Sequence, residues 1–301
     1  MNDPSARRFA WLSIAAALAT IALKVVAWRL TDSVGLLSDA LESLVNLAGA
    51  LMMLAMLSVA AMPADANHDF GHSKAEYFAS AFEGLLILIA AGAIGYAAVG
   101  RLIAPRALEQ VGAGLAVSAL ASLVNLGVGR VLLKAGERYH SIALEADARH
   151  LMTDVWTSVG VIAGVAAVAA TGWQRLDPLI ALLIAANIIW TGVQLIRRSA
   201  SGLMDTVLPA AQQAAVHQVL DTYRAQGLDF HALRTRQAGV RHFISVHVLV
   251  PGDWTVRRGH DLLETIEAEI RAVLPRAHVT THLEPLEDPA SWQDQTLDRR
   301  A

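Results

Sequence analysis

Two short stretches of the chain carry ionisable and amide side chains directly into long apolar runs. The first covers residues 38–46, at the head of one apolar run, and the second covers residues 146–154, which lead into the apolar run 155–171. Their polar residues are Asp39, Glu42 and Asn46 in the first stretch and Asp147, His150 and Asp154 in the second. On a helix, residues three or four apart lie on one face, so each stretch presents one polar arc.

The two arcs, brought together, would form a cage of four nitrogen and oxygen ligands. Its members would be Glu42, Asn46, His150 and Asp154. A charged side chain at bilayer depth costs about 2.5 to 3.5 kcal/mol on insertion scales. Two helices can be joined by polar residues without carboxylates, so this cost indicates a functional site. Four such ligands suit Zn²⁺ and similar divalent ions.

Asp39 and Asp147 precede the cage by one helical turn. Three roles are open to them: partners that orient the ligands, groups that solvate the start of a helix, or a vestibule that attracts cations. We favour the first role, because metal ligands in proteins are usually held by further hydrogen bonds.

A second group of metal-ligand types lies in the loop between two apolar runs. Residues 63–76 contain Asp65, His68 and His72, with the histidines four residues apart and the aspartate three residues before the first. A lone histidine in a loop is usually solvated, whereas this spacing is typical of a metal site.

The C-terminal third carries a third set of ligand types on expected strands and one helix. The set is His231, His247, His260, His282 and Glu284. His282 and Glu284 are two residues apart on one strand and therefore share a face. Scattered histidines on strands are more often plain surface residues, so spacing alone leaves this group open.

The elements that must position these residues are six apolar runs, each close to or longer than the roughly 20 residues needed to cross a bilayer. They lie near 9–30, 34–61, 76–101, 110–133, 142–171 and 177–196. An even number of spans puts both termini on one side. The flanking cations are Arg7, Arg8, Lys74, Lys134, Arg138, Arg197 and Arg198 on that side, against Arg29, Arg101, Arg106 and Arg175 on the other. This excess predicts that both termini are cytoplasmic.

Composition agrees with a membrane protein. The 301 residues are 54% hydrophobic and 17% charged, with a mean hydropathy of +0.43. The net charge of −3 and the lack of a basic stripe make nucleic acid an unsuitable partner. No cysteine is present, which excludes thiolate sites and favours imidazole, carboxylate and amide ligands. We interpret the run 9–30 as an uncleaved first helix, because it has spanning length and lacks a small-residue cleavage site.

After Arg198 the pattern changes to that of a small α+β domain. We expect helices near 209–226 and 255–274, and strands near 229–237, 241–250 and 278–284, in the order α-β-β-α-β. The expected division is a six-helix transmembrane domain over 1–204, a cytoplasmic metal-binding domain over 205–285 and a disordered polar tail over 286–301.

Several motifs resemble those of the cation diffusion facilitators, most closely the proteobacterial branch that exports ferrous iron and zinc. They are Ser38-Asp39-Ala40, the loop PADANHDFGHSKAEYF, ADARHLMTDVWTS, and LRTRQAG followed by FISVHV and THLEP. The resemblance covers about residues 7–285.

The resemblance implies a homodimer in the inner membrane, with six transmembrane helices and a ferredoxin-like βαββ cytoplasmic domain in each protomer. It implies exchange of a cytoplasmic divalent metal (Zn²⁺ first, then Fe²⁺, Co²⁺, Ni²⁺, Mn²⁺ or Cd²⁺) for protons by alternating access. It assigns the four-ligand cage to transport, and the loop group to a second metal site. It also assigns the five C-terminal residues to a binuclear site at the dimer interface, and Lys74 with Asp205 to a charge pair between the two domains.

One departure from the branch bears on the cargo. Where the branch has two aspartates in the second span, this chain has Glu42 and Asn46. The cage then holds two carboxylates instead of three, which weakens its hold on a divalent ion and alters its preference.

Two other functions compete with transport. A membrane-bound metal sensor would explain the soluble domain but not the ionisable groups at bilayer depth. A membrane metallohydrolase would use the same ligand types to activate water, but no HExxH-type pairing is present and the cage leaves no open position.

Overall fold

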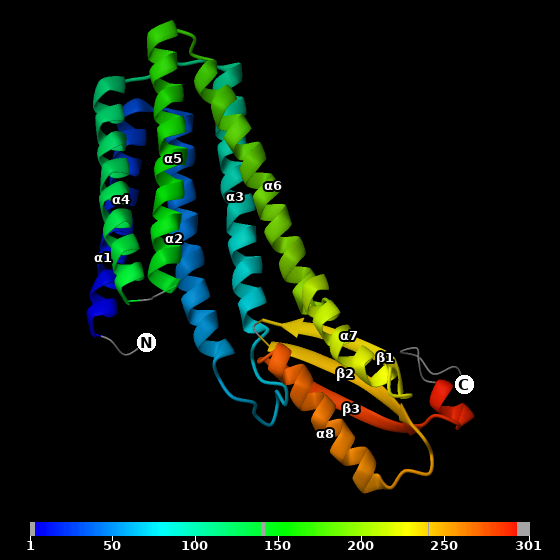
Figure 1. The fold of residues 1–301 in the computed structure, drawn as a ribbon. Helices are drawn as coiled ribbons and strands as arrows, with labels where there is room; N and C mark the ends of the chain where they lie inside the picture. The colour runs from blue at the N-terminus through cyan, green and yellow to red at the C-terminus, as the bar shows by residue number, and fades with distance from the viewer. Residues whose placement is uncertain (1–3, 140–141, 240, 294–301) are drawn as a thin grey trace. The chain divides into compact units, whose positions relative to one another are not determined.

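The computed structural model describes residues 4–139, 142–239 and 241–293 (Figure 1). The chain forms two compact units. One comprises residues 1–54 and 79–196, which we call the bundle unit, and the other comprises residues 55–78 and 197–301, which we call the sheet unit. Each unit is described by itself.

Six long helices account for the apolar runs. They are α1 (Pro4–Thr31), α2 (Val34–Ala60), α3 (Ala75–Ile103), α4 (Val111–Tyr139), α5 (Ile142–Thr171) and α6 (Leu176–Leu203). All six are long and apolar enough to cross a membrane. The shortest has 27 residues, which corresponds to roughly 40 Å at 1.5 Å per residue. This confirms the expected six-helix membrane protein.

Apolar side chains on these helices are widely exposed. Ile89, Trp156 and Leu183 are 60%, 74% and 72% exposed. Exposure of this extent fits contact with lipid, because the acyl chains of a bilayer are as apolar as leucine.

Small buried residues hold the bundle together. Ala27 of α1, Leu36 of α2 and Val161 and Val165 of α5 form one cluster. Helices α3 and α6 cross at Gly84 and Gly192: a Cβ on either glycine would lie 3.2 Å from the carbonyl oxygen of the other. Close backbone approach at glycine is a common way of packing helices in membranes.

Asp177, near the start of α6, caps the start of α2. Its carboxylate accepts hydrogen bonds from the Ser33 hydroxyl (2.6 Å) and from the backbone N–H groups of Val34 (2.8 Å) and Gly35 (3.2 Å). The side chain is 2% exposed. The negative charge also faces the positive end of the α2 dipole. This contact fixes the start of the helix that carries Glu42 and Asn46.

The sheet unit contains α7 (Ala210–Arg224), β1 (Asp229–Ala238), β2 (Arg241–Val250), α8 (Val256–Val273) and β3 (Ala277–Pro285). The sheet order is β1-β2-β3, with β1 antiparallel and β3 parallel to β2. The core contains Leu220 of α7, Ile266 of α8 and alternate residues of β2 such as Ile244 and Val246. Both helices therefore pack on one face of the sheet, and the expected small α+β fold is confirmed.

The turn between β1 and β2 packs against the loop that precedes α3. Gly239 has φ +57°, and a Cβ at this position would lie 2.5 Å from the Ser73 carbonyl oxygen. Its N–H donates to the Tyr77 hydroxyl at 3.1 Å. The loop and the hairpin are thus in direct contact, and only glycine fits there.

Residues 286–293 differ from the expected disordered tail. They include a short 3-10 helix, Pro289–Trp292, and the N–H of Leu286 donates to Val250 at 2.8 Å. The Trp292 ring lies 5.6 Å from that of His231. One aromatic side chain and a few backbone bonds order this segment, which polar composition alone did not indicate. Residues 294–301 of the expected tail lie outside the described residues.

Replacing Asp177 by alanine should lower the stability of the bundle unit. The change leaves two backbone N–H groups at the start of α2 without their acceptor, and loss of a helix cap costs roughly 0.5–2 kcal/mol. We expect a lower thermal unfolding midpoint for the detergent-solubilised protein. Asp253→Ala, at an exposed position, is the matched control; equal midpoints for the two variants would contradict this assignment.

Candidate metal sites

A small cavity of about 80 Å³, with several polar side chains among its apolar lining, lies between helices of the bundle unit. Its ionisable and polar lining residues include Ser43, Asn46, Asn125, Asp147, His150 and Asp154. They come from α2, α4 and α5, and residues of α1 complete the wall. Three of the four residues expected to form the cage therefore face one cavity.

Glu42 is half-buried on α2 and is not among the residues that line this cavity. Among the described residues, Glu42, His150 and Asp154 do not form a group whose ligand atoms all lie within 4.8 Å of one another. Asp154 is buried and His150 is exposed. The four-ligand cage thus stays a prediction from the sequence.

Asp39 has a partner that the sequence analysis missed. The Lys24 ammonium of α1 donates to Asp39 Oδ1 (2.9 Å) and to the Ser43 hydroxyl (2.7 Å). The Ser158 hydroxyl of α5 lies 2.9 and 3.1 Å from the two Asp39 oxygens. All four side chains are buried, with Lys24 and Asp39 only 1% and 2% exposed.

This network joins α1, α2 and α5 close to the cavity. Ser43 lines the cavity, and Ser158 lies one helical turn beyond Asp154. The role of Asp39 as a partner that orients metal ligands stays a prediction. A lysine within an apolar span requires a carboxylate partner, so Lys24 could have been found by asking which acid neutralises it.

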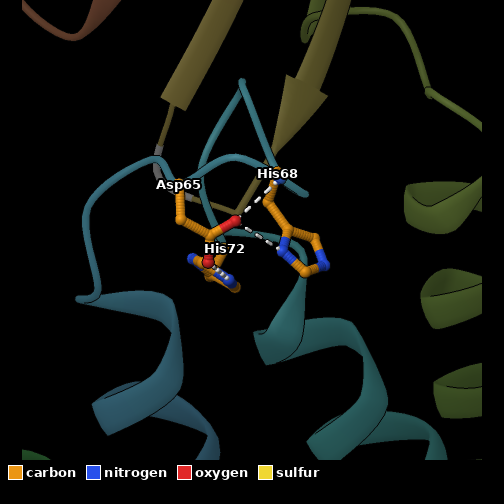
Figure 2. A group of neighbouring side chains, drawn as sticks. All are labelled: Asp65, His68 and His72. Atoms are coloured by element: carbon orange, nitrogen blue, oxygen red, sulfur yellow. Dashed lines mark hydrogen bonds and ion pairs between the residues drawn. The ribbon is translucent and has the colours of Figure 1, made fainter.

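The loop group is gathered into one cluster, shown in Figure 2. Asp65 Oδ1 lies 3.1 Å from His68 Nδ1, and Asp65 Oδ2 lies 3.4 Å from His72 Nε2. The two imidazole rings are 4.4 Å apart. Metal–ligand bonds of 2.0–2.1 Å in a tetrahedron separate the ligand atoms by about 3.3 Å. The cluster therefore has nearly the spacing that a tetrahedral ion requires.

The loop backbone prepares Asp65 for this role. The N–H groups of Asn67 and His68 both donate to Asp65 Oδ1 at 2.9 Å. These bonds, that from Asn67 first, hold the pKa of Asp65 below its usual range. The carboxylate consequently stays ionised, which is the form that binds a cation.

The sheet unit carries a second cluster, on the sheet face opposite the helices. His231, His247 and His282 are direct neighbours across β1, β2 and β3, because His231 pairs with His247 and His247 pairs with His282. Glu284 follows on β3, and a β-bulge interrupts β1 just after His231. Strand register thus brings together residues that lie about fifty positions apart in the sequence.

Three ligand atoms of this cluster form a compact triangle. His231 Nε2 lies 3.0 Å from Glu284 Oε2 and 3.1 Å from His247 Nδ1, and His247 Nδ1 lies 3.4 Å from the same oxygen. All three separations are close to the edge of a tetrahedral zinc site, about 3.3 Å. His282 Nε2 is 3.4 Å from Glu284 Oε1. His282 remains 61% exposed and so leaves one side of the cluster open.

His260 of α8 is exposed and does not belong to either described cluster of three or more ligand types. Its assignment to this metal site therefore stays a prediction. Trp292, which the sequence analysis had placed in the tail, packs against His231 instead.

Lys74 and Asp205 form an ion pair of 2.8 Å in the sheet unit. Lys74 also donates to the Leu203 carbonyl (3.2 Å), and Arg236 donates to Asp205 at 3.2 Å. Burial raises the pKa of Asp205, but the bonds from Lys74 and Arg236 outweigh this effect and hold the pKa below its usual range. The loop before α3 and the segment after α6 are thereby tied together. The role of the pair between domains stays a prediction.

Comparison with known proteins supports two family assignments. Residues 10–204 match the family model described as the cation efflux transmembrane domain, and residues 208–286 match that of the cation efflux protein cytoplasmic domain. An uncharacterized transporter of Synechocystis sp. is 57% identical over 97% of this chain and 94% of its own length. The cation-efflux pump FieF of Serratia proteamaculans is 32% identical over 90% of each chain.

Among solved structures, the metal-bound C-terminal domain of the CzcD transporter from Thermotoga maritima matches 26% of this chain and 92% of its own. The sequence identity is 27% and the TM-score is 0.24.

Breaking the Lys24–Asp39 pair should destabilise the bundle unit strongly. Removing one partner of a buried ion pair leaves an uncompensated charge and costs roughly 3–5 kcal/mol, whereas replacing both by apolar residues is often neutral. We expect Asp39→Leu to lower the thermal unfolding midpoint in detergent. The double variant Lys24→Met/Asp39→Leu should recover most of the loss. A double variant as unstable as the single one would show that the pair itself is not the origin.

Removing the loop cluster should abolish one metal site and leave the others. We expect Asp65→Ala/His72→Ala to bind one Zn²⁺ fewer per chain than the wild type, as measured by equilibrium dialysis of the purified protein. His217→Ala, which removes an exposed histidine of α7, is the matched control. An unchanged number of bound ions would remove these residues from any metal site.

Proposed function

Since the chain belongs to the cation efflux family, we propose that it exports divalent metal ions from the cytoplasm in exchange for protons. Zn²⁺ and Fe²⁺-type ions are the proposed cargo, with Zn²⁺ first. The observation that carries the proposal is the cavity among the apolar helices that Asn46, His150 and Asp154 line. Such groups are costly among lipid-facing helices, and a transport path explains why they lie there.

The proposed exchange follows from competition for the same atoms. A divalent ion needs a neutral His150 and ionised carboxylates, and protons bind the same groups. In the inward-facing state, metal displaces protons; in the outward-facing state, protons displace metal. An unperturbed imidazole titrates near pH 6.5, so a modest pH difference across the membrane changes the fraction of imidazole that carries a proton.

The cluster on the three strands of the sheet unit has a separate proposed role. The triangle of His231, His247 and Glu284 leaves its open side at the exposed His282. We place this face at the interface of a homodimer, where bound metal favours one arrangement of the protomers. A ligand shifts such an equilibrium only by its differential affinity for the two arrangements. The cluster would therefore regulate transport and not carry the cargo.

We place the protein in the inner membrane with both termini in the cytoplasm. The excess of Lys and Arg flanking the spans on the terminal side supports this orientation. It puts the loop cluster and the sheet unit on the side from which the metal is taken.

Asp154→Asn should remove metal-coupled proton flux. The change keeps the shape of the side chain but removes a carboxylate that lines the cavity, so we expect Zn²⁺ uptake into proteoliposomes to fall at least about tenfold, the scale reported for disturbing metal-site residues. An internal zinc indicator and an internal pH indicator would be read together. Thr153→Val, at an exposed neighbouring position on α5, is the control.

Two outcomes would contradict the proposal. Wild-type protein that binds Zn²⁺ but moves neither metal nor protons would indicate a sensor. Full flux in Asp154→Asn would remove this carboxylate from the path.

A further inference from the structure

Asn125 is a buried amide of α4 that neither the sequence analysis nor the proposed function uses. It is 1% exposed. Its side-chain oxygen is buried and, among the residues that the structure describes, has no hydrogen-bond partner. Buried polar atoms are almost always satisfied, so an exception of this kind calls for an explanation.

The cavity beside Asn125 supplies this explanation. The residue lines the same cavity as Asn46, His150 and Asp154, which belong to the two helices expected to hold the ion. Helix α4 packs against both α1 and α5, so its buried face closes the cavity from a third direction. The lining includes four further side chains of metal-ligand types, two carboxylates, one imidazole and one amide, among apolar and hydroxyl-bearing residues.

Two other buried polar residues of α4 differ from Asn125 in their position, although the Ser118 hydroxyl also has no hydrogen-bond partner among the described residues. Ser118 and Ser122 lie seven and three residues before Asn125, and both are buried. The Ser122 hydroxyl donates to the Ser118 carbonyl within the helix (3.1 Å), and neither serine lines the cavity. Asn125 is therefore the member of this polar face that reaches the cavity.

We propose that Asn125 is an additional ligand for the transported divalent ion, supplied by α4, and that it favours oxygen-preferring ions such as Mn²⁺ over Zn²⁺. The proposal rests on the transport function proposed above; it concerns how strongly Mn²⁺ competes with Zn²⁺ and leaves Zn²⁺ as the first proposed cargo. A neutral amide oxygen adds a hard donor without adding charge, and carbonyl oxygens suit Mn²⁺ better than Zn²⁺. Asn46 is a second amide on the same cavity wall, so two amide oxygens would stand where only one was expected.

A further ligand also favours ions that accept more than four donors. Zn²⁺ sites in proteins are mostly four-coordinate, whereas the oxygen-preferring ions are commonly six-coordinate. A ligand from α4 therefore raises the coordination number available in the cavity, and selectivity follows from number and hardness together.

The test compares Mn²⁺ with Zn²⁺ transport in proteoliposomes. We expect Asn125→Leu, which keeps the branched arrangement of side-chain atoms but removes the oxygen, to lower Mn²⁺ uptake about tenfold relative to Zn²⁺ uptake. Asn125→Asp should raise the Mn²⁺ affinity, because it adds a charge at the same atom. Ser118→Ala, on the same helix but outside the cavity, is the matched control and should keep the wild-type ratio.

Each other outcome counts against the proposal. An unchanged Mn²⁺ to Zn²⁺ ratio in Asn125→Leu overturns it, as does an equal loss of both ions, which indicates a purely structural role. If Asn125→Leu does not fold, an Asn125→Asp variant with Mn²⁺ affinity no higher than wild type overturns it.

A binding measurement separates this inference from the transport proposal. The electron paramagnetic resonance signal of free Mn²⁺ disappears on binding, so titration of detergent-solubilised wild type and Asn125→Leu reports affinity without any flux. If the wild type transports no metal but Asn125→Leu binds Mn²⁺ more weakly than the wild type, only the proposed function is refuted. If the wild type transports metal but Asn125→Leu binds Mn²⁺ as tightly as the wild type, only the role of Asn125 is refuted.

Discussion

A charge inside an apolar span has to be neutralised within the protein, and the Lys24–Asp39 pair meets this requirement in the bundle unit. Both side chains are almost fully buried, and hydroxyl groups on α2 and α5 complete the network. The Lys24 ammonium and the Asp39 carboxylate bind each other and therefore stay in place. The proposed exchange of cations therefore falls to the ionisable groups of the neighbouring cavity, and not to this pair.

Much of the fold could be predicted because its signals are local. Blocks of apolar residues located the six long helices, and the alternation of residues in 241–250 located β2 to the residue. The packing that depends on single side chains could not be predicted in this way. Asp177 lies more than 140 positions from the helix start that it caps, and Trp292 orders a segment whose composition is polar.

The candidate sites also differ in whether they depend on local spacing or on contacts between distant segments. The loop cluster depends on residues within one short turn, and its spacing in the sequence was sufficient to find it. The alignment of His231, His247 and His282 depends on strand register, which no pattern within one strand reveals. Lys24 and Asn125 went unnoticed because each stands alone in an apolar run, and their significance comes from helices that meet only in three dimensions.

The β1–β2 hairpin has a candidate metal cluster near each end. At its turn, Gly239 touches Ser73, the residue next to His72; at its other end stand His231 and His247. Between His231 and Ala238 the strand extends over roughly 23 Å at 3.3 Å per residue. Because the contact at Gly239 is close, a shift of the loop would be passed to the paired strands of the hairpin. An ion bound at one of these clusters would then change the affinity of the other cluster through the backbone of a single hairpin.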